Sequence, residues 1–176
     1  MLKNIAIVAA LLTGLAPIAS AQLSPADKTF VMKLAKSNNY ELKAAQMEQD
    51  MSTNDAYKTY AQMIIADHTQ AGQDLASAVS AADPSVQLPT DVSATDQAHL
   101  DTLKNAGKSF DVKYRMQMLS THQAALALVK TYLTHPNDNA GIKTFAQGLP
   151  TVFKKHWDEA KKLPRQTGTR TSRQRK

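Results

Sequence analysis

Apolar residues recur along this chain at steps of three and four, which is the spacing of one helix face, and no useful stretch alternates as a strand would. The clearest stripe follows Asn54, a helix-capping residue, and ends at Asp83-Pro84, where proline stops the helix. Its members are Tyr57, Ala61, Ile64, His68, Ala71, Leu75 and Val79. We predict a helix over residues 54–83.

The region before this stripe predicts another helix. Ser24-Pro25-Ala26-Asp27 combines a capping serine, a proline at the first helical position and an acid in the first turn. The helix is expected to run to about Met51, and residues 37–39 are a weak point where it bends or restarts.

Two more helices follow in the second half of the chain. One is expected from Ser109, as its cap, to about His135, with the stripe Tyr114, Met118, His122, Ala125 and Val129. The other is expected from about Asn139 to Pro164, with the stripe Ile142, Phe145, Leu149, Val152, His156, Ala160 and Leu163. Pro150 lies inside it and predicts a kink or a short break.

Residues 84–108 join the two halves and are too long for a plain turn, with a short helix expected around residues 95–105. Four amphipathic helices with a long crossover between the second and third are typical of one architecture. The predicted fold is therefore an all-α, ferritin-like four-helix bundle over residues 22–163.

The first 21 residues predict an export signal. Lys3 precedes an apolar run over residues 5–16, and Ala19-Ser20-Ala21 resembles a cleavage site. The run is shorter than the roughly 20 residues that span a bilayer. We expect removal of residues 1–21 and a location in the periplasm or cell envelope; an uncleaved membrane anchor is the alternative.

The net charge of +6 belongs to one end of the chain. Seven basic residues lie in residues 161–176, whereas all 15 acidic residues lie within residues 22–160. We expect residues 164–176 to form a disordered tail, because they lack apolar residues for a core. Docking on an anionic envelope surface is the functional alternative. No specific nucleic-acid binding is expected, because the tail has no aromatic residue to stack on bases.

The chain has no cysteine, which excludes disulfides, thiolate catalysis and c-type haem attachment. Three of its five histidines, however, lie on predicted core faces, one on each of three helices: His68, His122 and His156. Each lies about 20 to 25 Å along its helix, and Glu41 is expected at a similar level. Three imidazoles and a carboxylate at one depth suit a divalent transition metal such as zinc, iron or copper.

A structural polar network is the other interpretation of these groups, since buried imidazoles also bond to carboxylates and carbonyls of neighbouring helices. Asp67 points away from His68 around the helix, so we expect it to orient a different histidine. Tyr114 is expected beside the metal ligands. Asp111 lies in the first turn of its helix, about 16 Å from His122, and is better explained as a cap or network member.

Several local patterns resemble one bacterial family, the domain of unknown function 4142. They are Ser24-Pro25-Ala26-Asp27 with Phe30, Tyr40-Glu41, Asp67-His68-Thr69, Phe110-Asp111 with Tyr114 and His122, and Phe145-Ala146 and Leu149-Pro150 with His156. The resemblance covers about residues 24–163 and implies an exported ferritin-like bundle. Members are often labelled outer membrane proteins, but the family has no established reaction to carry over.

The sequence thus predicts a non-enzymatic envelope protein of unassigned activity, whose mid-bundle cluster is either a metal site or a structural polar network. A metal-dependent redox enzyme is the competing hypothesis. It is weakened because no glutamate is followed three residues later by histidine, as in di-iron carboxylate bundles.

Overall fold

The computed structural model describes residues 22–136 and 139–165, which are all-helical and contain no strand. The elements are α1 (Pro25–Met51), α2 (Asp55–Ala82), α3 (Ala94–Lys104), a 3₁₀ turn η1 (Gly107–Ser109), α4 (Phe110–Leu133) and α5 (Ala140–Lys162). The all-α prediction is confirmed. The predicted signal peptide and residues 166–176 of the predicted tail lie outside the described residues, so both stay predictions.

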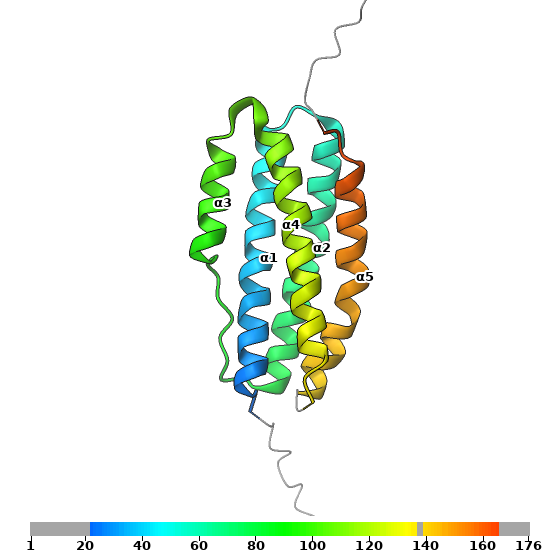
Figure 1. Cartoon of the computed structure of the whole chain (residues 1–176). Helices are drawn as coiled ribbons and strands as arrows, with labels where there is room; N and C mark the ends of the chain where they lie inside the picture. The colour runs from blue at the N-terminus through cyan, green and yellow to red at the C-terminus, as the bar shows by residue number, and fades with distance from the viewer. Residues whose placement is uncertain (1–21, 137–138, 166–176) are drawn as a thin grey trace, which may run out of the picture.

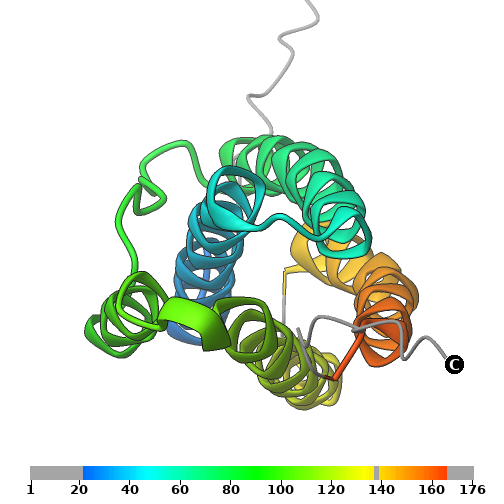
Figure 2. The same ribbon diagram turned by 90° about the horizontal axis from the view of Figure 1, so that it is seen from above.

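Four long helices lie side by side, and α3 lies outside them against α1 and α4 (Figure 1). Seen along their axes, the four follow one another around a ring in the order α1, α2, α5, α4 (Figure 2). The segment from Asp83 to Ser109 climbs the full length of the molecule, so that α2 and α4 run in the same direction (Figure 1). This connection contains the short helix that the sequence predicts.

The helix starts follow the capping rules with one exception. Ser24 and Asp27 form a reciprocal capping box at α1, and the side chains of Asn54 and Asn139 cap α2 and α5. Ser109 makes no side-chain cap at α4, so this prediction is wrong. The reason is local: the η1 turn, which Gly107 enters with a φ of 53°, leads directly into the helix.

Two predicted weak points leave their helices unbroken. α1 continues through residues 37–39, and α5 continues through Pro150.

Arg115 of α4 supports the end of α5, since its guanidinium donates to the carbonyls of Ala160 and Lys161. Those carbonyls belong to the last turn, which has no intrahelical donors for them.

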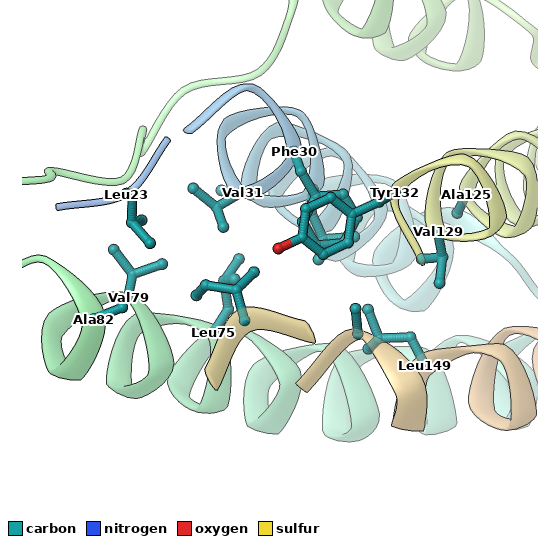
Figure 3. Close-up of a cluster of buried hydrophobic side chains, with 14 of the residues drawn as sticks. Leu23, Phe30, Val31, Leu75, Val79, Ala82, Ala125, Val129, Tyr132 and Leu149 are labelled. Atoms are coloured by element: carbon teal, nitrogen blue, oxygen red, sulfur yellow. The ribbon is translucent and has the colours of Figure 1, made fainter. Parts of the chain in front are cut away.

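The apolar core has two parts along the ring axis. The part near the start of α1 contains Phe30 stacked on Tyr132, with ring centroids 3.9 Å apart. Side chains of α2 and α5, including Leu75, Val79 and Leu149, complete it (Figure 3). The other part gathers around Tyr40, Tyr57 and Tyr114. The polar groups predicted from the sequence lie between these two parts or within the second.

None of the described helices, in residues 22–136 and 139–165, combines the length and the hydrophobicity needed to cross a bilayer.

Candidate metal centre

The structure brings His68 of α2, His122 of α4 and His156 of α5 together in the interior. One ring nitrogen of each lies within 4.8 Å of the others, and all three residues are buried. Glu41 of α1 completes the group: its Oε2 lies 3.2 Å from His68 Nε2 and 3.2 Å from His122 Nε2. His122 Nε2 and His156 Nδ1 are 3.0 Å apart. All four helices of the ring therefore contribute one side chain.

The outward nitrogen of each imidazole has its own acceptor. His122 Nδ1 lies 2.8 Å from the carbonyl oxygen of Met118, one turn earlier in α4. His68 Nδ1 lies 2.9 Å from Asn38 Oδ1, and His156 Nε2 lies 2.8 Å from Asp67 Oδ2. A carbonyl, an amide oxygen and a carboxylate can only accept, so each outward nitrogen carries the proton.

In each neutral imidazole the proton lies on the outward nitrogen, which faces away from the cluster. The inward nitrogen, which faces the other ligands, therefore carries a lone pair. The three inward nitrogens and Glu41 Oε2 are thus four acceptors facing one another. Glu41 Oε2 and His68 Nε2 are buried and have no hydrogen-bond partner within the described part of the chain. Buried polar atoms are normally paired, so this arrangement calls for a bound cation or for extra protons.

Burial disfavours the extra protons on the imidazoles. It lowers the pKa of His122 to about 4 and that of His68 well below the usual value. It also lowers the pKa of His156, although the Asp67 carboxylate opposes this effect. Burial raises the pKa of Glu41 to about 8, against a smaller lowering by Ser37. The site therefore keeps its imidazoles neutral, which is the form that binds metals.

Three of the six distances among the four acceptor atoms resemble those of a metal-ligand set. Donors at the corners of a tetrahedron, 2.0–2.1 Å from a zinc ion, lie about 3.3 Å apart. The three contacts of 3.0 to 3.2 Å among Glu41, His68, His122 and His156 are close to this value. Three imidazole nitrogens and one carboxylate oxygen also form a common donor set for zinc, iron or copper.

Asp67 supports the cluster from outside, as the sequence predicts. One oxygen, Oδ2, accepts from His156 Nε2 and from Lys155 Nζ at 2.8 and 2.9 Å. A carboxylate that holds the far nitrogen of a ligating histidine fixes its tautomer and its orientation. Asp67 is therefore a positioning residue for His156.

Asp111 and Tyr114 lie in a separate group near the start of α4. The neighbour of Asp111 is Glu48, whose pKa is raised to about 8 by burial and then by the Asp111 carboxyl. The ring of Tyr114 packs edge-on against Tyr60, with centroids 6.0 Å apart. No hydrogen bond within residues 22–136 and 139–165 links Asp111 or Tyr114 to the three histidines. This placement agrees with the network role considered for Asp111. In this part of the chain Tyr114 makes no hydrogen bond to the proposed ligands, although burial and then nearby charges, those of Glu48 and Glu41 among them, raise the pKa of its hydroxyl.

Sequence reasoning missed Asn38, Lys155 and Glu48. Asn38 precedes Glu41 by three residues and so shares its helix face, a spacing that could have revealed it. Glu48 follows Glu41 by seven residues, which again places both on one face. Lys155 carries no such signal, because its contact with Asp67 depends on how α2 and α5 pack.

Comparison with known proteins agrees with the family resemblance. A profile of the domain of unknown function DUF4142 matches residues 13–163. Among solved structures, a DUF305 fragment from Deinococcus radiodurans is similar, with a TM-score of 0.67 over 80% of this chain and 95% of that one. At 13% identity this similarity shows a shared fold alone. A search of curated proteins finds no significant match. Since the profile covers most of its length, the chain belongs to the DUF4142 family.

Proposed function

We propose that this protein is an exported, ferritin-like four-helix bundle that binds one divalent transition metal ion through Glu41, His68, His122 and His156. The ring of four long helices with a lengthwise crossover supports the bundle (Figures 1 and 2). Residues 1–21, with their export-signal pattern, support a location in the periplasm or envelope.

One observation carries the metal proposal: four buried acceptor atoms face one another, and each imidazole is held by a separate outer partner. A structural network would alternate donors and acceptors, as buried polar groups normally do. Here the metal-free site needs two extra protons to pair its four inward atoms. A divalent cation supplies the same charge with one ion.

The test is the metal content of the mature protein, residues 22–176, purified without an affinity tag. Equilibration with zinc, iron or copper followed by removal of free metal should leave about one ion per chain, measured by mass spectrometry. His122→Gln should lose that ion.

Two exposed histidines supply the matched control. His99 and His135 lie on the surface, away from the cluster. A variant with both changed to alanine should keep the bound ion. Retention by His122→Gln together with loss from the double variant would locate the metal on the surface and overturn the proposal.

A further inference from the structure

A pocket of about 450 Å³ leads from the surface to the candidate metal centre. Glu41, His68 and His156 line its inner end, whereas His122 is fully buried and is not part of its lining. A metal ion held by all four residues therefore has His122 on its inner side and the pocket on its outer side. This outer side is the direction from which an external ligand can approach.

The walls of the pocket are mainly apolar. Side chains from all four long helices line it, among them Leu34 of α1, Leu75 of α2, Ala125 of α4, and Leu149 and Phe153 of α5. A volume of this size falls within the range of small-molecule sites, which combine apolar walls with a few polar groups. Walls of this kind select a ligand with an apolar body rather than water or an inorganic ion.

The net charge at the inner end of the pocket determines which polar group of the ligand can bind there. Three neutral imidazoles, one carboxylate and a divalent cation leave a net charge of +1. Lys155 and Asp67, which also line the pocket, pair with each other and leave this balance unchanged. The further lining carboxylate, Asp74, is exposed to solvent and accepts a hydrogen bond from Gln70. An anionic donor neutralises the remaining charge in a poorly solvated site.

We infer that the pocket binds a small amphiphilic anion, whose charged head contacts the metal ion and whose short apolar chain lies against Leu34, Leu75, Leu149 and Phe153. This inference rests on the proposed metal site. It adds a ligand class that the metal-binding proposal does not contain.

The experiment uses the full mature chain loaded with Co²⁺, whose visible absorption reports changes in coordination. Acetate, butyrate and hexanoate are titrated as probes. Each fully buried methylene should tighten binding about fourfold. Hexanoate has four more methylenes than acetate, so burial of only two of them gives at least roughly tenfold tighter binding. Equal affinities for the three anions, or an unchanged cobalt spectrum, would overturn the ligand inference.

Gly148 allows the pocket to be filled without touching the metal ligands. It lines the pocket, and a Cβ added there meets no atom within 4 Å. Gly148→Leu should weaken hexanoate binding about tenfold and leave Co²⁺ affinity unchanged. The neighbouring Gln147→Leu, at an exposed position outside the pocket lining, should change neither. Hexanoate affinity unaltered by Gly148→Leu would contradict the inference.

A second filling variant guards against misfolding of the first. Val152 lines the same pocket and is partly exposed. Val152→Trp should reproduce the loss of hexanoate binding. Failure of the wild-type chain to bind Co²⁺ would refute the metal site itself, whereas Co²⁺ binding without chain-length dependence would refute the ligand inference alone.

Discussion

Two buried carboxylates on the same helix have opposite surroundings. Asp27, at the start of α1, is 1% exposed, and Glu41, near its middle, is 2% exposed. Asp27 Oδ1 accepts from the Tyr132 hydroxyl at 2.6 Å and the Asn139 amide at 3.1 Å, and its Oδ2 accepts from the Ser24 amide at 3.0 Å. Glu41 Oε2 faces two imidazole nitrogens that are themselves acceptors.

The pKa values follow this difference. Burial alone raises the pKa of Asp27, but hydrogen bonds from Tyr132, Ser24 and Asn139 outweigh it and leave the pKa below the ordinary value. The pKa of Glu41 is raised to about 8, because burial acts there almost unopposed. Burial alone therefore does not identify a site. A buried carboxylate surrounded by donors stabilises the fold, whereas one that faces acceptors, as Glu41 Oε2 does, is paired by its own proton or by a bound cation.

The largest expected effect is on metal-dependent stability. Saturating Zn²⁺ at 1,000 times its dissociation constant should stabilise the wild-type protein by about 4 kcal/mol. Glu41→Gln should lose most of this gain, because the amide is a poor metal ligand, whereas Asp27→Asn should keep it. Chemical denaturation with and without Zn²⁺ measures both. An equal Zn²⁺ response in the two variants would erase the distinction between the two carboxylates.

The same two variants should differ in the opposite sense without metal. Asp27→Asn should destabilise the protein by about 2 kcal/mol, since an amide N–H replaces an acceptor that Ser24 needs. Glu41→Gln should leave the metal-free protein at least as stable as the wild type, because its amide can donate to His68 or His122. Urea denaturation in the presence of a chelator provides the comparison.

The Asp27 effect should also depend on pH. A carboxyl whose pKa is lowered by folding contributes its full stabilisation above the unfolded-state pKa of about 3.9 and loses it as pH falls through the folded value. The stability gap between wild type and Asp27→Asn should therefore be constant between pH 5 and pH 7 and shrink below about pH 4. A gap that widens on acidification would mean that the hydrogen bonds to Asp27 are not formed.

Asp67→Asn should reduce metal affinity about 10- to 100-fold, the usual effect of removing a carboxylate that orients a ligating histidine. Because the Asp67 side chain is 32% exposed, the change should cost little fold stability. Competition with a chromophoric chelator measures the affinity. Asp50→Asn, at an exposed position near the end of α1 and outside the pocket lining, serves as the control and should change affinity little.

The smallest expected effect comes from Gly72→Ala. A Cβ at this position would lie 3.1 Å from Asn38 Nδ2, so the Asn38 side chain that holds His68 must shift slightly. Metal affinity should fall a few fold, while metal-free stability gains from replacing a helical glycine, by up to about 1 kcal/mol. Isothermal titration and thermal unfolding should show these opposite signs; unchanged affinity would mean that Asn38 does not position His68.

Much of the fold could be predicted because its signals are local. Ser24-Pro25, Asn54 and Asp83-Pro84 mark helix ends through the chemistry of single residues, and the apolar stripes fix which face of each helix turns inward. His68, His122 and His156 belong to these stripes, so their burial was predictable, and similar depths along the helices made their meeting a reasonable hypothesis.

What escaped prediction depends on how the helices rotate and slide against one another. Asp27 could be identified as a first-turn acid, but not as the partner of Tyr132, more than 100 residues away. The contact of Lys155 with Asp67 and the edge-on packing of Tyr114 against Tyr60 depend on helix packing in the same way. Helical periodicity gives a face and a depth within one helix, whereas a binding site also requires the register between helices.

The most direct measurement is anomalous diffraction at the zinc edge from crystals of the untagged, zinc-loaded protein. We expect one strong peak inside the ring of helices, about 2.0 to 2.2 Å from His68 Nε2, His122 Nε2, His156 Nδ1 and Glu41 Oε2. Peaks only at surface residues such as His99 and His135, with none between the three buried imidazoles, would contradict the proposed site.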